Sequence, residues 1–323
     1  MSRSTEQIGV GIIGTGYIAT AGHGPVVTAA AGARLAGVLS RRLDAAREFL
    51  TTMEVDAARP YDDLDAFLAD PGIGLVVVAS PDGLHFPQAE ASLRSGKHVI
   101  VEKPMALSLA EAQTLVDLAA ERGLVLAVSY HLRCHAGHEL LRRRILDGAL
   151  GALRYLRLAW SYPIDESNWR ARGDIARWWS LSATGTHCID LARWFADDMG
   201  DWTRFEAVLN NTRWGGRDES AVIAAQLASG ASVDVLGSIQ FDEYTRIELF
   251  GDRGSAFCEG TLGPEGGGTI VLNGEPLDFS PTNPFAEQLD RVLAAIDGRA
   301  DGPPADGAVG LRAVRDLLLA EPG

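Results

Sequence analysis

Short apolar runs alternate with amphipathic segments through the first 130 residues of the chain. Runs rich in β-branched residues are typical of buried parallel strands, and the segments between them have the apolar spacing of helices. Strands are expected at 8–13, 33–40, 75–79, 97–101 and 124–130. Helices are expected after residue 16 and at 43–51, 61–68, 86–95 and 107–122. This alternation predicts an α/β domain with a parallel sheet over residues 1–129.

The pattern changes from residue 130 onward. A helix is expected at 131–147, and from residue 153 apolar and polar residues alternate as they do in antiparallel strands. These strands are expected at 153–162, 204–210, 221–228, 231–240, 245–250 and 255–259, followed by helices at 283–296 and 308–320. The glycine-rich residues 260–268 are expected to form a loop. We predict a second domain, α+β, over 130–323, with a large open and mainly antiparallel sheet.

The composition excludes several classes of function. A net charge of −14 opposes binding to nucleic acid or to an anionic membrane. Apolar runs such as 75–79 are too short to span a bilayer, and the first residues lack the apolar core of a signal peptide, so a cytoplasmic protein is expected. The three cysteines are isolated, so neither a disulfide nor a metal site is predicted. Small molecules or other protein chains remain as partners.

A glycine turn follows the first predicted strand, in the segment Ile8–Ala19 (IGVGIIGTGYIA). Gly14 permits a sharp turn, and Gly16 removes a Cβ from the path of a pyrophosphate that binds at the helix N-terminus. The pattern GxGxxA also occurs in ordinary turns, so its interpretation depends on the crossover unit that follows. In that context it predicts a Rossmann dinucleotide-binding domain. The expected cofactor contacts here are Gly14, Gly16, Tyr17 and Ile18.

The end of the second predicted strand bears on the choice of cofactor. An acidic residue there would bind the ribose hydroxyls and favour NAD, but the chain has Ser40, Arg41 and Arg42. A small hydroxyl followed by two guanidiniums suits a 2′-phosphate, which predicts NADP. NAD stays possible, because the two arginines could simply begin an exposed helix.

Two more polar segments follow predicted strands, SPDGLH at 80–85 and Glu102-Lys103-Pro104 after 97–101. The carboxyl ends of parallel strands are where ligands bind in such folds. Lys97 and Lys103 are the only lysines among 29 basic residues, and a lysine, unlike an arginine, can lose its proton. At a strand end, Lys103 could donate to a substrate oxygen and stabilise charge that develops there.

The order and spacing of GIIGTGYIA, SPDGLH and VEKP resemble the Gfo/Idh/MocA oxidoreductases, the glucose–fructose oxidoreductase and inositol dehydrogenase-like family. Members are nicotinamide-dependent sugar and cyclitol dehydrogenases and reductases. The resemblance implies that Lys103 lies beside the nicotinamide and the reacting carbon, and that Pro104 holds the turn, often through a cis peptide. The further cofactor contacts that we expect from these segments are Ser80, Pro81, His85 and Glu102.

The second domain carries two more segments that resemble the family. Trp169-Arg170 is similar to a Trp-Arg element near the cofactor, so cofactor contacts are expected from both. Residues 183–190 are similar to a segment that reads Asp-x-Gly-x-His-x-x-Asp at a helix start, in which Gly185, His187 and Asp190 match. The resemblance implies that His187 is the general base, and Asp190 is expected to be a structural partner.

One position departs from that family segment. Ala183 stands where the family has an Asp that orients the His or shares its proton. His187 could then be held by Thr184, Thr186 or another group, or Lys103 could take over more of the proton transfer. Histidine suits general base catalysis near neutral pH whichever group orients it.

These observations predict an NADP-preferring oxidoreductase that transfers a hydride between nicotinamide and a ring carbon of a sugar, sugar derivative or cyclitol. Lys103 and His187 are the expected catalytic residues. The family pairs its open sheets between subunits, so a homodimer or homotetramer is expected. Two alternatives stay open: a glycosidase-like enzyme that retains NAD, and a non-enzymatic NADP sensor, which the Ala183 departure keeps possible. The substrate itself and the direction of reaction do not follow from the sequence.

Overall fold

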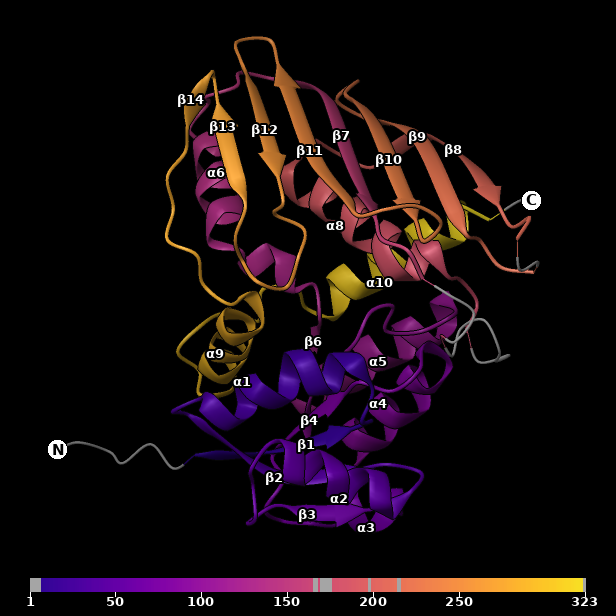
Figure 1. The fold of residues 1–323 in the computed structure, drawn as a ribbon, viewed down its shortest axis with the longest axis vertical. Coiled ribbons are helices and arrows are strands. Elements are labelled where there is room, and N and C mark those ends of the chain that lie inside the picture. The colour runs from indigo at the N-terminus through magenta and orange to yellow at the C-terminus, as the bar shows by residue number, and fades with distance from the viewer. Residues whose placement is uncertain (1–6, 165–167, 169–175, 197–198, 214–215, 322–323) are drawn as a thin grey trace, which may run out of the picture. The chain divides into compact units, whose positions relative to one another are not determined.

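The computed structural model describes residues 7–164, 168, 176–196, 199–213 and 216–321 (Figure 1). The chain divides into two compact units, which we call unit 1 (1–129 and 285–312) and unit 2 (130–284 and 313–323). The change at residue 130 coincides with the change in sequence pattern. Residues 285–312 differ from the sequence-based division, because the apolar residues of α9 (Pro284–Ile296) pack into the core of unit 1.

Unit 1 contains a six-stranded parallel sheet with the order β3-β2-β1-β4-β5-β6. Its strands are β1 (Ile8–Ile13), β2 (Ala33–Leu39), β3 (Arg59–Tyr61), β4 (Leu75–Val78), β5 (His98–Val101) and β6 (Leu126–Val128). The order reverses between β1 and β4, and ligands bind at such a switch point in doubly wound sheets. The sequence did not predict β3, and the helix expected from residue 61 begins only at Leu64, because Tyr61 belongs to that strand.

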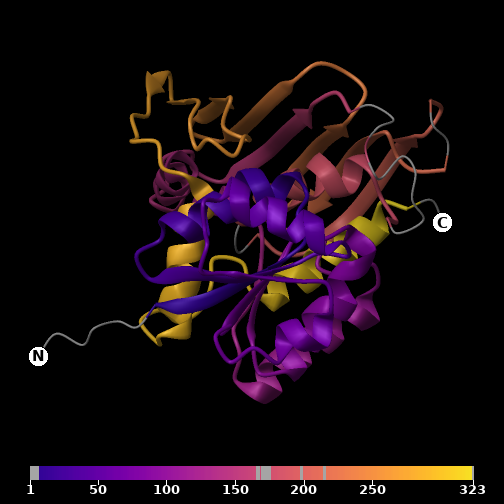
Figure 2. The same ribbon diagram turned by 60° about the horizontal axis from the view of Figure 1, so that its bottom comes forward.

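Helices cover both faces of this parallel sheet (Figure 2). They are a π-helical turn η1 (Ile18–His23), α1 (Gly24–Ala29), α2 (Leu43–Thr52), α3 (Leu64–Leu68), a short turn η2 (Asp82–Leu84), α4 (His85–Arg94) and α5 (Leu109–Arg122), together with α9. One face packs against α1, α2 and α9 in a cluster that includes Val10, Phe49 and Leu289. On the other face, a Cβ at Gly11 would lie 2.4 Å from the ring of Phe67, so glycine lets α3 approach the sheet.

Unit 2 is built on an eight-stranded sheet with the order β14-β13-β12-β11-β7-β10-β9-β8 (Figure 1). The strands are β7 (Leu153–Ser161), β8 (Trp202–Asn210), β9 (Ser220–Leu227), β10 (Ser232–Ser238), β11 (Tyr244–Gly251), β12 (Ser255–Glu259), β13 (Thr269–Leu272) and β14 (Glu275–Pro276). Every neighbouring pair is antiparallel except β10 and β7, which are parallel. The predicted mainly antiparallel sheet is confirmed, whereas the short strands β13 and β14 were missed.

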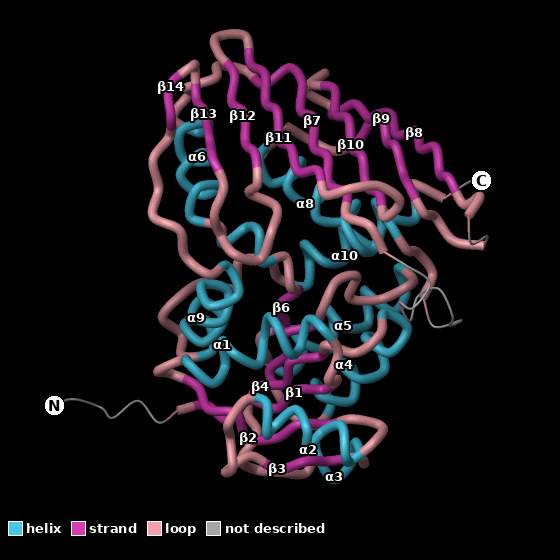
Figure 3. The backbone as a smooth tube through the Cα atoms, in the orientation of Figure 1, coloured by secondary structure: helices cyan, strands magenta, loops and turns pink. Residues whose placement is uncertain are grey.

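The helices α6 (Ala136–Leu146) and α8 (Thr186–Phe195) lie on one face of the large sheet (Figure 3). On the opposite face Val208 is 72% exposed and its neighbour Val222 is 46% exposed. Unit 2 also contains the short helices η3 (His131–Cys134) and η4 (Leu181–Gly185), and α10 (Gly307–Leu319) contributes its residues from 313 onward.

The single helix expected at 131–147 is wrong, because the chain breaks at His135. This residue has an extended backbone, so η3 ends before it and α6 begins after it. Its Nδ1 accepts hydrogen bonds from the backbone N–H groups of Gly137 (3.1 Å) and His138 (3.3 Å). An imidazole therefore caps α6, a role that Ser, Thr, Asp or Asn usually fills.

Within the described ranges, no helix combines the length and the apolar character that a bilayer crossing needs. The same ranges contain no group of three or more His, Cys, Asp or Glu residues placed to hold a metal ion. Cys134, Cys188 and Cys258 all lie in the described part of the chain, are buried, and form no disulfide with one another.

Candidate active site

The glycine turn directly follows β1 in unit 1. Gly14 has a φ of 105°, and a Cβ there would lie 2.5 Å from the carbonyl oxygen of Ala79, so the position requires glycine. A Cβ on Gly16 would meet nothing within 4 Å. Open space thus lies beside the backbone at Gly16, as the close approach of a pyrophosphate requires. The residues present at this turn fit a dinucleotide.

The helix after the turn begins at Ile18. Tyr17 precedes it and is 79% exposed, whereas Ala19 is fully buried against the sheet. The N–H group of Thr20 donates to the Gly16 carbonyl oxygen over 3.0 Å, and the earlier N–H groups of a helix have no acceptor within it. Such an N-terminus favours an anion.

The end of β2 presents two arginines to solvent. The N–H of Ser40 donates to the carbonyl of Tyr61 over 3.0 Å, which fixes the strand end beside β3. Arg41 and Arg42 follow and are both exposed. The guanidinium of Arg42 lies 3.6 Å from the carboxylate of Asp44, and both of these side chains are more than 70% exposed. Two solvated cations therefore follow the strand that neighbours β1, where the adenosine ribose lies in Rossmann folds.

His85 joins the loops that follow β4 and β5. Its Nε2 lies 2.7 Å from the carbonyl oxygen of Ser80, and its Nδ1 lies 2.7 Å from that of Pro104. The ring is 1% exposed, and Ser80 donates its hydroxyl to Gln88 over 2.6 Å. Pro81, between Ser80 and His85 in the sequence, is half-buried. The ring of His85 therefore ties together two loops at the carboxyl edge of the sheet.

The Glu102-Lys103-Pro104 segment lies at the end of β5. The peptide bond between Lys103 and Pro104 is cis, as the resemblance implied, and Lys103 is half-buried. Glu102 is 5% exposed, and its carboxylate lies 2.9 Å from Nε2 of His23. Burial would raise the pKa of Glu102, but the hydrogen bond with His23 and the charges of His23 and Lys103 outweigh burial and hold this pKa at about 2.

His187 lies in the first turn of α8, in unit 2, and is 2% exposed. Three rings surround its imidazole: His131 at 5.1 Å between centroids, Trp160 at 5.3 Å and Tyr130 at 5.9 Å. Trp160 comes from β7, whereas Tyr130 and His131 come from the start of unit 2. The side chain is thus held from several sides by aromatic contact.

A pair of glycines brings the start of α8 close to the sheet. A Cβ on Gly237 of β10 would lie 3.0 Å from the backbone of Gly185, so this close approach favours a residue without a side chain. The buried carboxylate of Asp218 accepts hydrogen bonds from Trp179 N–H (2.8 Å), the Ser180 hydroxyl (2.6 Å) and Leu181 N–H (2.6 Å). Asp218 therefore anchors the start of η4, which leads directly into α8.

The surroundings of Ala183 are apolar. Its side chain is 4% exposed and packs in a cluster with Trp179 and Ile239. The hydroxyl of Thr184 donates to the Ser180 carbonyl over 3.1 Å, and that of Thr186 lies 2.7 Å from the Tyr130 hydroxyl. Both hydroxyls that could have replaced the missing carboxylate thus have other hydrogen bonds.

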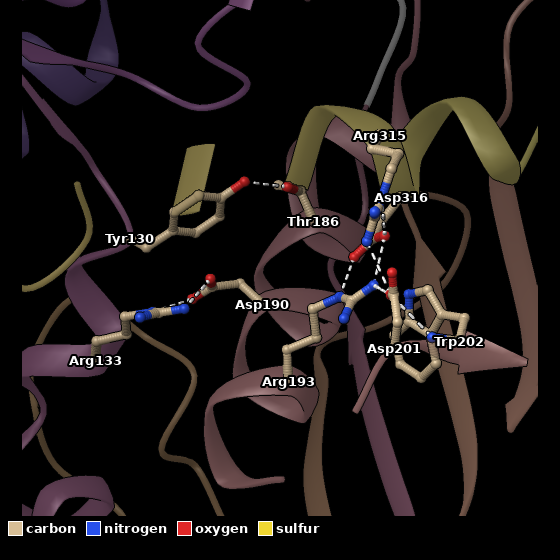
Figure 4. A network of polar contacts seen from close by, with 9 residues as sticks. All are labelled: Tyr130, Arg133, Thr186, Asp190, Arg193, Asp201, Trp202, Arg315 and Asp316. Atoms are coloured by element: carbon tan, nitrogen blue, oxygen red, sulfur yellow. Dashed lines mark hydrogen bonds and ion pairs between the residues drawn. The ribbon is translucent and has the colours of Figure 1, made fainter. Parts of the chain in front are cut away.

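Asp190 forms a buried ion pair with Arg133. Nε and Nη2 of Arg133 donate to the two carboxylate oxygens over 2.8 and 2.7 Å (Figure 4). The expectation that Asp190 is a structural partner is confirmed. Burial and the charge of Asp190 raise the pKa of Tyr130, so its hydroxyl keeps its proton at neutral pH.

A second buried ion pair holds the far end of α8. Arg193 donates to both carboxylate oxygens of Asp316 on α10, and its Nη2 also donates to Asp201 over 2.8 Å (Figure 4). Arg315 donates to the same oxygen of Asp201 over 2.8 Å. Because Asp316 is fully buried, burial raises its pKa, although the contact with Arg193 opposes this shift.

Within each unit, the structure brings predicted site residues together. In unit 1 the glycine turn, Ser80, Pro81, His85, Glu102 and Lys103 follow β1, β4 and β5, and Ser40, Arg41 and Arg42 follow β2. In unit 2 His187 and Asp190 share α8, whereas Trp169 and Arg170 lie outside the described residues. The sequence interpretation missed His23, His131, Asp218 and Gly237.

The parallel sheet with its glycine turn, followed by a large open sheet, defines a two-domain protein of the dinucleotide-binding class. More specifically, the chain belongs to the GFO/IDH/MocA oxidoreductase family. The family model described as "Oxidoreductase family, NAD-binding Rossmann fold" matches residues 8–130. The model of the GFO/IDH/MocA C-terminal domain matches residues 138–257, so the two cover more than two thirds of the chain.

Similar proteins include enzymes that act on cyclitols and sugars. The scyllo-inositol 2-dehydrogenase (NADP(+)) of Bacillus subtilis is 28% identical over 190 residues, which are 58% of this chain and 51% of that protein. This match therefore spans about half the length of the relative. The dTDP-3,4-didehydro-2,6-dideoxy-alpha-D-glucose 3-reductase of Streptomyces violaceoruber is 28% identical over 302 residues, 91% of this chain and 86% of that protein.

The fold is similar to that of an aldose-aldose oxidoreductase from Caulobacter crescentus, solved in complex with glycerol. The TM-score is 0.88 at 24% identity, and the match covers 98% of this chain and 97% of that chain. Both units of the present chain therefore have counterparts in a solved fold.

Proposed function

We propose that the protein is an NADP-dependent oxidoreductase that transfers a hydride between nicotinamide and a ring carbon of a sugar, sugar derivative or cyclitol. The observation that carries this proposal is the position of Lys103. It is half-buried at the carboxyl end of β5, on the edge of the sheet where the glycine turn follows β1. Membership of an oxidoreductase family supports the reaction type, and the named substrates of the relatives support the substrate class.

In this proposal the cofactor binds along the carboxyl edge of unit 1. Gly14 and Gly16 hold the pyrophosphate, and Arg41 holds the 2′-phosphate. The preference for NADP over NAD rests on the two exposed guanidiniums after β2, and the name of the Bacillus relative supports it. The other proposed contacts are Tyr17, Ile18, Ser40, Arg42, Ser80, Pro81, His85, Glu102, Trp169 and Arg170. When bound, the cofactor supplies or accepts the hydride.

The protein's own residues handle the proton and the charge. When a CH–OH group is oxidised, its carbon loses a hydride with two electrons, and its oxygen loses one proton. Lys103 donates a hydrogen bond to that oxygen and stabilises the charge that develops there. His187 accepts the proton as general base, and reduction of the carbonyl reverses both steps. Ala183 provides no carboxylate beside His187, and we propose that ring contacts with His131 and Trp160 help to orient the imidazole.

We also propose that the open face of the eight-stranded sheet forms a homo-oligomer contact, in a homodimer or homotetramer. Val208 and Val222 form a cross-strand pair on this face, and Leu236 lies next to Val222 on β10. Adjacent apolar side chains on a sheet face favour burial against another surface. A second copy of the chain offers the same face.

The test compares the two lysines of the chain. We expect Lys103→Met to keep NADPH binding, measured by cofactor fluorescence, and to lower kcat on the order of 10²-fold to 10³-fold, because a preorganised donor to the reacting oxygen is lost. The matched control is Lys97→Met. The Lys97 ammonium donates to the backbone carbonyls of Asp70 and Ile73, away from the glycine turn. Turnover is followed at the nicotinamide absorbance with sugars, cyclitols, keto-sugars and nucleotide sugars. Equal kcat in both variants would refute the role of Lys103.

A further inference from the structure

Four buried polar side chains meet at the carboxyl edge of the parallel sheet in unit 1. They come from different elements: His23 ends η1, Glu102 follows β5, Ser129 follows β6 and Gln288 lies on α9. None of them is more than 5% exposed. Buried polar groups need hydrogen-bond partners, because a buried donor or acceptor without one lowers the free energy of unfolding.

The carboxylate of Glu102 is the centre of this group. Its Oε1 lies 2.9 Å from Nε2 of His23, and since an ionised carboxylate only accepts, Nε2 carries the proton. Its Oε2 accepts the backbone N–H of Lys103 over 3.3 Å, and the Ser129 hydroxyl also hydrogen-bonds to the Glu102 carboxylate. The amide of Gln288 in turn donates to Ser129 over 3.4 Å. The Glu102 carboxylate is therefore engaged in hydrogen bonds within unit 1.

We propose that His23 is a positioning residue for Lys103: by holding the Glu102 carboxylate, it fixes the backbone of Lys103 and keeps a negative charge beside the lysine ammonium. The role in turnover rests on the proposed function, whereas the placement of Lys103 and its protonation do not. The carboxylate of Glu102 then acts through Lys103, so the cofactor contact proposed above for Glu102 is made by its backbone.

The physical reason lies in the burial of the carboxylate. A buried carboxylate with too few donors takes up a proton, because desolvation disfavours the charged form. Without the His23 donor, Glu102 would lose charge, and the N–H of Lys103 would lose a strong acceptor. The titratable groups that act on Glu102 are His23 from η1 and Lys103 on the same segment. On the other side, His85 from α4 contacts the carbonyl of Pro104.

The chain offers a direct readout, since Lys97 and Lys103 are its only lysines. With ¹³C-labelled lysine, the cofactor-free protein gives two side-chain signals in an NMR titration, and Lys97→Arg assigns them. We expect the titration midpoint of Lys103 to fall by about one pH unit in Glu102→Gln, because the negative charge that interacts with the lysine is lost. His23→Met, which has no donor, should produce a similar fall. His23→Gln, which keeps an N–H donor, should restore most of it.

The matched control is His98→Gln. His98 begins β5, the strand that ends before Glu102, and its Nδ1 accepts the Val125 N–H over 3.0 Å. We expect no change in the Lys103 midpoint in this variant. An unchanged Lys97 signal reports that unit 1 is folded in each variant. If His23→Met does not fold, His23→Asn replaces it, because the Asn side chain is too short to reach Glu102.

An unchanged Lys103 midpoint in His23→Met, or in His23→Asn where that variant replaces it, overturns the proposal, as does an equal fall in His98→Gln. In turnover assays, His23→Met should lower kcat on the order of 10²-fold with unchanged KM for NADPH, because a small misplacement of a reacting group has such an effect. If the wild-type protein oxidises or reduces none of the substrates, the proposed function fails. The lysine titration still decides the role of His23 in that case.

Discussion

His138 should make unit 2 sensitive to acid. Its imidazole is fully buried on α6 and stacks on His135 with a centroid distance of 4.3 Å. Nδ1 lies 3.0 Å from the carbonyl of Leu132, and Nε2 lies 2.9 Å from the hydroxyl of Thr261. The carbonyl must accept, so Nδ1 carries the proton and Nε2 accepts from Thr261. The neutral ring satisfies both partners, whereas a second proton, on Nε2, would remove the acceptor to which the Thr261 hydroxyl donates.

The size of the effect follows from the pKa of His138. Burial, and then the charge of His135, lower this pKa from 6.5 to about 3. A base whose folded pKa lies below its unfolded pKa stabilises the fold above the unfolded value and loses that contribution as the pH falls toward the folded value. At 1.36 kcal/mol per pH unit, the loss between pH 7 and pH 5 is about 2 kcal/mol, and near pH 3 it approaches about 5 kcal/mol.

The assay is urea unfolding of the wild type and of His138→Gln at pH 8, 7, 6 and 5. His138→Gln removes the titration, whatever it does to stability at neutral pH. We expect the free energy of unfolding of the wild type to fall by about 2 kcal/mol more than that of the variant between pH 7 and pH 5. Between pH 8 and pH 7 the two should change in parallel. Parallel curves down to pH 5 would refute the burial argument.

Three further predictions concern the cofactor, the core and assembly. Arg41→Ala should weaken NADPH binding about 10-fold to 100-fold in fluorescence titrations and leave NADH binding unchanged, because it removes a charge-assisted hydrogen bond to phosphate; equal weakening of both would contradict the assignment. Asp190→Asn should lower the free energy of unfolding by about 3–5 kcal/mol, since it leaves the buried Arg133 charge without its counter-charge, and a loss below about 1 kcal/mol would count against this reasoning. Val208→Glu should dissociate the oligomer in light scattering, whereas Leu319→Glu, exposed on α10, should not.

The sequence predicted most strands of both sheets, because each has enough apolar residues at regular spacing to reveal burial. It missed β3, β13 and β14, which have four residues or fewer. It also missed the break at His135, because the apolar spacing continues through this residue, and only its imidazole, which caps the start of α6, marks the break. The pairing of α9 with unit 1 could not be predicted either, since an amphipathic helix does not reveal which sheet its apolar face covers.

The same limit applies to the site. Gly14 and Lys103 could be found because they directly follow predicted strands. His23 and Glu102 are 79 residues apart, and Asp218 lies 38 residues beyond the Ser180 hydroxyl that it anchors. Gly237 interrupts an otherwise ordinary strand, and only its contact with Gly185 gives it meaning. Such roles come from a partner distant in the sequence, and no local pattern reports them.

The path of the chain affects the order in which the protein can be completed during synthesis. Unit 1 needs Phe285, Leu289, Val292 and Leu293 of α9 to close its core, although the other buried residues of that cluster lie before residue 130. The ribosome must therefore add more than 150 residues, including most of unit 2, before the dinucleotide-binding unit can finish folding. The apolar surface that α9 later covers is exposed during this interval, so the nascent chain at that stage is a candidate for chaperone binding.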